Sequence, residues 1–109
     1  MAQSGNIFDG VHLDPSREQF LELMRSSGMR VERIVSSGQV TPEGQWYDQN
    51  WTEWVLLLQG KAQIQFETEE APRVLHPGDW LEIKPRERHR VTCTDDKQPT
   101  IWIAVHDGL

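Results

Sequence analysis

Apolar and polar positions alternate along most of the chain, in short runs separated by glycine and proline. In the run 62–66, Ala62, Ile64 and Phe66 alternate with two glutamines, directly after the turn-forming pair Gly60-Lys61. A period of two places alternate side chains on opposite faces of a β-strand. The same pattern predicts further strands over 29–36, 46–48, 53–59, 73–76, 80–83, 89–93 and 100–106. Many short strands separated by such turns are typical of a β-sandwich or barrel.

The segment before residue 29 has a different pattern. Asp14-Pro15 fits the start of a helix, because Asp caps free backbone amides and Pro suits the first helical position. The apolar residues of 20–24 fall on one helical face, and Gly28 is placed to end the helix. We therefore expect one short amphipathic helix. Residues 1–28 would form an N-terminal extension whose helix packs on a barrel formed by residues 29–109, within a single domain.

The net charge and the cysteine content limit the classes of partner and the cellular compartments that we expect. The formal net charge is -6 over 109 residues, which argues against nucleic acids and anionic membranes, because both need a cationic surface. The chain has no apolar run near the roughly 20 residues of a membrane span, and Met1–Gly5 lacks the basic and apolar regions of a secretory signal. Cys93 is the only cysteine, so no disulfide forms within the chain, and we expect a cytoplasmic protein.

Two segments carry the candidate chemistry, and they resemble the paired motifs of the cupin family. In the first segment, Glu53 and Gly60 have the family's spacing after Gly44, while Tyr47 and Gln49 occupy the two positions where histidines are usual. The second segment begins with the turn Pro77-Gly78-Asp79 and continues to His89.

The second segment also departs from the family pattern. Arg86 stands where a glycine is usual, and Cys93 stands where an asparagine is usual. The resemblance covers about residues 38–105. It implies an all-β fold, a cupin-type antiparallel β-barrel of the jelly-roll kind, around one internal pocket.

The resemblance also implies a degenerate metal site. Glu53, His89 and Gln49 would be the ligands of a divalent ion such as Fe, Mn, Ni or Zn, with two imidazoles fewer than the family has. Tyr47 would be the catalytic proton donor or an orienting group. The remaining expected pocket residues are Trp46, Trp51 and Cys93.

Each of these residues has a structural alternative. Glu53 would instead pair with Arg90 or Arg33, and His89 would bond a backbone carbonyl. Tyr47 and Gln49 would be polar lining, and Cys93 a small buried apolar residue. We expect the other three histidines, His12, His76 and His106, to be structural or exposed.

Three functions are compatible with this pattern. The first is a metal-dependent enzyme of the dioxygenase or isomerase class, acting on a small polar or anionic molecule. The second is a binding or sensing module that holds a small-molecule ligand without metal. The third is a dimerisation domain, and a homodimer is expected in any case, with Trp54, Leu56 and Leu58 on the face opposite Glu53. The basic cluster Lys84–Arg90 would hold an anionic substrate or, as we favour, form a solvated loop.

Overall fold

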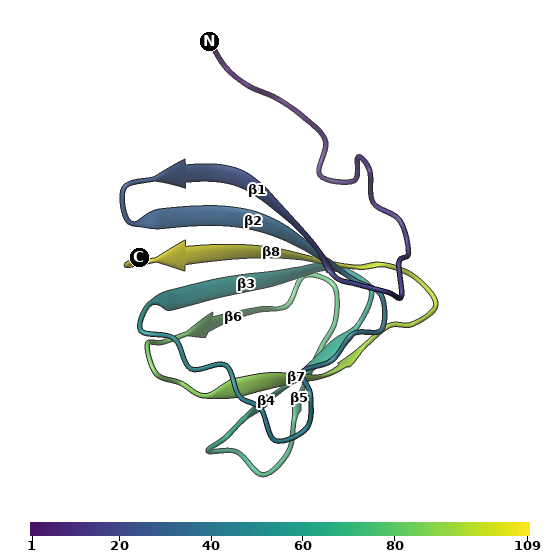
Figure 1. Ribbon diagram of the computed structural model, residues 1–109, viewed down its shortest axis with the longest axis vertical. Helices are drawn as coiled ribbons and strands as arrows, with labels where there is room; N and C mark the ends of the chain where they lie inside the picture. The colour runs from purple at the N-terminus through teal and green to yellow at the C-terminus, as the bar shows by residue number, and fades with distance from the viewer.

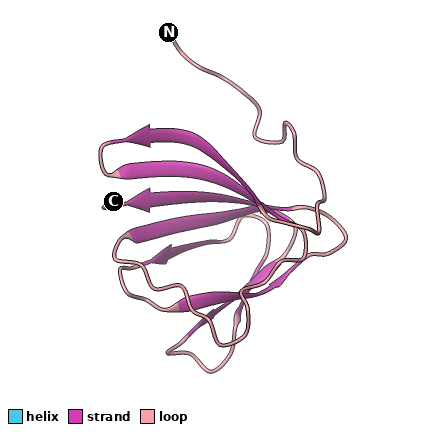
Figure 2. Cartoon of the chain, in the orientation of Figure 1, coloured by secondary structure: helices cyan, strands magenta, loops and turns pink.

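The structure is a computed structural model that describes residues 1–109. It contains eight β-strands and no helix (Figures 1 and 2). The chain therefore has no helix that is long and apolar enough to cross a membrane. The strands are β1 (Gln19–Ser26), β2 (Met29–Ser36), β3 (Thr52–Gln59), β4 (Ala62–Phe66), β5 (Arg73–Leu75), β6 (Trp80–Ile83), β7 (His89–Thr94) and β8 (Thr100–Asp107).

The strands form two antiparallel sheets that face each other, as the sequence pattern predicted. One sheet has five strands in the order β1-β2-β8-β3-β6, and the other has three in the order β5-β4-β7. In Figure 1 the larger sheet forms the upper part of the molecule and the smaller sheet lies below it, while the N-terminal segment extends away. Because β8 pairs between β2 and β3, the last strand of the chain lies at the centre of the larger sheet.

The hydrophobic core lies between the sheets and follows the predicted alternation. Leu57 of β3 is fully buried, and Ile64 of β4 and Trp102 of β8 are almost so. Burial of such side chains contributes about 1.5–3 kcal/mol each relative to exposure. The core cluster consists of Val55, Leu57, Ala62, Ile64, Phe66, Leu75, Leu81, Ile83 and Trp102.

The helix predicted before residue 29 is wrong, because β1 occupies this segment. Asp14 does form the predicted local cap: its Oδ1 accepts from the Ser16 amide at 3.1 Å, and the Arg17 amide donates to its carbonyl. However, the chain then extends and pairs with β2 from Gln19 onward. A helix would leave the hydrogen-bonding edge of β2 without a partner, so pairing between strands overrides the local helical signal.

A β-bulge explains why this strand has a helical spacing of apolar residues. The pairing of β1 with β2 shifts between Glu22 and Met24, so Leu23 is an extra residue. After the shift, Leu21 and Met24 point to the same face although they are three positions apart. Three-residue spacing also occurs along a helix face, which is why periodicity alone could not distinguish this bulged strand from a helix.

Candidate functional site

A central cavity with a volume of about 810 Å³ opens between the two sheets. The inward-facing side chains of β2, β3 and β8 form one wall, and those of β4 and β7 form the opposite wall. About half of the lining residues are apolar. Five residues singled out by the sequence motifs or their flanks line it together: Tyr47, Gln49, Trp51, Glu53 and His89.

His89 is at the start of β7 and is only 4% exposed. Its Nδ1 lies 2.8 Å from the carbonyl oxygen of Glu87. Because a carbonyl only accepts, Nδ1 carries the proton, so the lone pair of the neutral form lies on Nε2. Nε2 makes no hydrogen bond within the protein. His89 therefore presents a free acceptor to the cavity that it lines.

Tyr47 is held beside His89 by the backbone. Its amide donates to the His89 carbonyl at 2.8 Å, and the His89 amide donates back to the Tyr47 carbonyl at 3.2 Å. The two rings stack with centroids 5.5 Å apart. Burial, and next the nearby Glu18 carboxylate, raise the pKa of the Tyr47 phenol above its usual value. Tyr47 is therefore a protonated phenol at neutral pH, and can act as a hydrogen-bond donor.

Gln49 and Glu53 form a pair at the base of β3. The Gln49 amide Nε2 donates to Glu53 Oε1 at 2.9 Å, and the Arg86 amide donates to the Gln49 backbone carbonyl at 2.7 Å. The second bond fixes the irregular segment before β3, so that Tyr47 and Gln49 reach the cavity without belonging to a strand.

The ion pairs considered for Glu53 are not formed. Arg33 is buried and donates to the carbonyl oxygens of Ile7 and Asp9 at 3.0 and 2.7 Å, away from the cavity. Arg90 donates to the Thr41 carbonyl. Glu53 therefore has a neutral partner, Gln49, and no cationic one.

His106 is a cavity residue that the sequence analysis placed among structural or exposed histidines. It is 6% exposed and bonded on both sides: Trp51 Nε1 lies 2.9 Å from its Nδ1, and its Nε2 lies 2.9 Å from Glu32 Oε1. An indole N–H only donates, so Nδ1 must be the acceptor and Nε2 must carry the proton toward Glu32. The alternation of β8 could have found His106, because it shares parity with the inward-facing Trp102.

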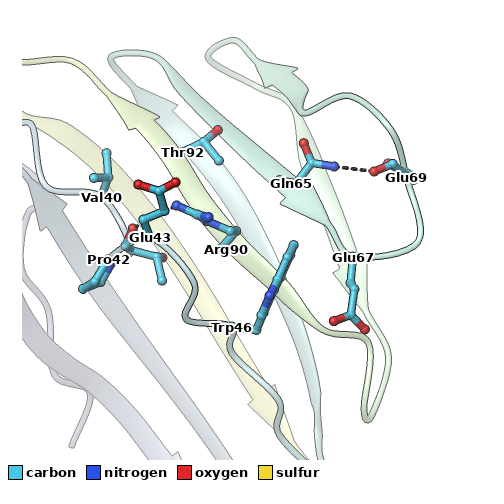
Figure 3. Close-up of a pocket in the computed structure, with 10 residues that line it drawn as sticks. Val40, Pro42, Glu43, Trp46, Gln65, Glu67, Glu69, Arg90 and Thr92 are labelled. Atoms are coloured by element: carbon cyan, nitrogen blue, oxygen red, sulfur yellow. Dashed lines mark hydrogen bonds between the residues drawn. The ribbon is translucent and has the colours of Figure 1, made fainter.

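Two expected pocket residues lie outside this cavity. Trp46 lines a separate, shallower groove, where its ring lies beside Arg90 (Figure 3). The guanidinium groups of Arg88 and Arg90 lie 5.9 and 5.8 Å from the Trp46 ring centroid. Cys93 is half-buried, does not line the cavity, and has its Sγ 3.9 Å from the Thr94 carbonyl oxygen.

The basic cluster lies mainly on the surface and is engaged in ion pairs. Arg86 lies 3.2 Å from Asp48, and Arg88 lies 2.7 Å from Glu67, with all four side chains substantially exposed. Pairs of this kind contribute little to stability, about 0–1 kcal/mol. Arg86 has a φ of 65°, in the left-handed region that favours glycine, which is the residue usual in the family at this position.

The donor groups fit a transition-metal site poorly. Glu53 and His89 are the only histidine or carboxylate ligands of the predicted set, and the third, Gln49, can offer only a neutral amide oxygen, a weaker ligand, because its amide nitrogen donates to Glu53. No group of three or more His, Cys, Asp or Glu side chains is placed to hold a metal ion. Catalytic zinc sites, for comparison, have three protein ligands.

Comparisons with known proteins agree with the fold. A crystal structure from Ralstonia eutropha JMP134, named a "putative mannose-6-phosphate isomerase", is 44% identical and has a TM-score of 0.95, covering 99% of this chain and 100% of that one. A cupin superfamily protein from Desulfitobacterium hafniense DCB-2 is 15% identical, with a TM-score of 0.72 over 89% of this chain and 83% of that one. A protein from Thermus thermophilus is 14% identical, with a TM-score of 0.76 and 98% coverage of both chains.

No curated protein matches the chain. The family model described as "Cupin domain" matches residues 33–106, which include both motif segments and seven of the eight strands wholly or in part. The resemblance inferred from the spacing of Glu53, Gly60 and His89 is thereby confirmed. The chain belongs to the cupin family.

Proposed function

We propose that this cupin binds a small organic molecule in the central cavity, in contact with His89 and Tyr47. The observation that carries the proposal is the free Nε2 of His89, an acceptor on a buried ring without a protein partner. Buried polar groups in folded proteins are nearly always hydrogen-bonded, so an unused one in a cavity indicates a place for a ligand or water. The cavity is large enough for a small molecule, and its mixed lining is typical of ligand sites.

Proton transfer is the second candidate function, because a donor and an acceptor lie side by side. The Tyr47 phenol keeps its proton, and the stacked His89 ring offers a lone pair. A bound molecule touching both could gain a proton from one and lose one to the other, which is the chemistry of many isomerases. The Ralstonia relative is named a "putative mannose-6-phosphate isomerase", which agrees with this class of reaction. Dioxygenase chemistry, the other class considered, would need the metal site, whose predicted ligands include only one histidine and one carboxylate.

A divalent ion on Glu53, His89 and Gln49 stays a prediction from the family resemblance. All three line the cavity, which supports it, while the lack of a third histidine or carboxylate ligand opposes it.

Titration with benzyl alcohol, a neutral hydroxyl probe, tests the binding function. We expect the ¹⁵N resonance of His89 Nε2 to shift, because the probe donates a hydrogen bond to it. Val91→Trp places a large side chain in the cavity and should remove the shift. Val74→Trp, at an exposed position of β5, is the control and should leave it unchanged. Shifts confined to residues outside the cavity, with His89 unaffected, would contradict the proposal.

A further inference from the structure

Three carboxylates inside the cavity are held by neutral groups. Glu32 accepts from His106, whose neutral form is fixed by the Trp51 indole. Glu53 accepts from the Gln49 amide. The third carboxylate, Glu18, accepts from the Ser36 hydroxyl at 2.5 Å. None of the three lies within ion-pair distance of a lysine or an arginine, so none of them forms an ion pair with a basic side chain.

The arginines near the cavity form no ion pair with these three carboxylates, and Arg33 and Arg90 donate to backbone carbonyl oxygens instead. Arg17 is at the rim, its side chain is 78% exposed, and its Nε lies 3.7 Å from Asp14. Arg30 is opposite His106 in the pairing of β2 with β8, but it does not line the cavity. The cavity contains no lysine. The fourth carboxylate of the lining, Asp48, already has Arg86 as its partner.

The free hydrogen-bonding capacity of the cavity also consists mainly of acceptors. His89 Nε2 is an acceptor without a partner, on a residue that is almost fully buried. The carboxylates retain unused lone pairs, because each oxygen can accept more than one bond. A ligand that matches this set must donate hydrogen bonds and carry positive charge. A phosphate group does the opposite, since it is anionic and mainly accepts.

We propose that the cavity selects a small organic cation, a protonated amine, with its ammonium group directed to the carboxylates and His89 Nε2. The apolar part would pack against the apolar half of the lining, which includes Ile34, Val55 and Trp102. Attraction between opposite charges strengthens inside a cavity, where the effective dielectric constant is below that of water. This inference rests on the proposed binding function and specifies the ligand class of the same site.

A bare metal ion matches the cavity less well than an organic cation. The acidic groups are spread over the lining and are not gathered into a group of three ligands. A metal ion would also make no contact with the apolar half of the lining of this cavity, whose volume is about 810 Å³. Charge and shape together therefore favour an amine with an alkyl or ring substituent.

Calorimetric titration with n-butylammonium, butan-1-ol and butanoate tests the inference, because the three probes share a carbon chain and differ in charge. We expect butylammonium to bind at least tenfold more tightly than butan-1-ol, and butanoate not to bind. Glu32→Gln and Glu53→Gln should each weaken butylammonium severalfold with little effect on butan-1-ol. Glutamine keeps a carbonyl acceptor for His106 or Gln49, so the folded structure is preserved. Glu82→Gln, an exposed position of β6, makes the same change in net charge outside the cavity and should change nothing.

The outcomes separate this inference from the proposed function. Equal affinity for butylammonium and butan-1-ol would overturn the cation preference while leaving the cavity as a binding site. Tighter binding of mannose 6-phosphate than of butylammonium would also overturn it. Stoichiometric binding of Mn²⁺ or Zn²⁺ that is lost in Glu53→Gln would show that the acceptors serve a metal, and would overturn the amine class. If no probe binds and benzyl alcohol leaves His89 unaffected, both proposals fail.

Discussion

At the scale of single residues, hydrogen-bond partners decide which ring nitrogen of each cavity histidine carries the proton. The Glu87 carbonyl places the proton of His89 on Nδ1, whereas the Trp51 indole places that of His106 on Nε2. The two histidines are both almost fully buried, yet one is a free acceptor and the other is used on both sides. For this reason, His89 is the histidine available to a ligand, and His106 positions Glu32.

Tyr47 gives a direct test at this scale, because it is the only tyrosine of the chain. Its pKa is raised, first by burial, above the usual value of 10.0. We expect the near-ultraviolet absorbance of tyrosinate to appear at higher pH in the folded protein than in urea-unfolded protein. The unfolded chain then loses this proton first, so the free energy of unfolding should fall as the pH rises from the unfolded pKa through the folded pKa. Coincident titration of folded and unfolded protein would contradict the described environment of Tyr47.

At the scale of elements, turns fix the register that brings the motif residues together. Gly60, between β3 and β4, has a φ of 89°, and a Cβ added there would lie 2.8 Å from the Thr100 Cα. Gly78, in the Pro-Gly-Asp turn, has a φ of 96° but open space around it. The two family glycines therefore serve different needs: Gly60 permits a close approach of backbones, and Gly78 supplies only the turn conformation.

Alanine substitutions at these two glycines should distinguish the cost of a left-handed conformation from the added cost of a steric clash with Thr100. Gly78→Ala should lower the free energy of unfolding by about 1–2 kcal/mol, the cost of a left-handed conformation. Gly60→Ala should lower it by about 2–5 kcal/mol, because overpacking against Thr100 is added. Urea unfolding measures both. Equal losses at the two positions would show that β8 moves away at little cost.

At the scale of the whole molecule, the larger sheet has an apolar outer face. Trp54 and Trp80 stack there with centroids 6.1 Å apart, and Trp80 is 58% exposed. Leu56 pairs with Trp80 across β3 and β6, so it faces the same side. Exposed apolar patches in globular proteins often mark contacts with other chains, which supports the homodimer expected from the sequence.

Light scattering tests the dimer. We expect the mass of a dimer for the native chain, and the mass of a monomer for Trp80→Lys, because a buried lysine would oppose association. Val74→Lys, exposed on the smaller sheet, is the control and should remain dimeric. A native chain with the mass of a monomer would contradict the expected dimer.

The cytoplasmic location expected from the single cysteine also stays a prediction.

The sequence by itself determined seven of the eight strands and hence the all-β fold. These follow from local rules, since alternation and turn residues act between neighbours along the chain. The inward direction of Glu53 and His89 was implied by the resemblance to the cupin motifs. Only the tertiary structure decided that 19–26 is a strand, because that choice depends on the open edge of β2. It alone also joined Trp51, His106 and Glu32, which are far apart in sequence and meet because β8 lies between β2 and β3. The charge of the cavity depends on these long-range contacts, and so does the ligand class that we infer.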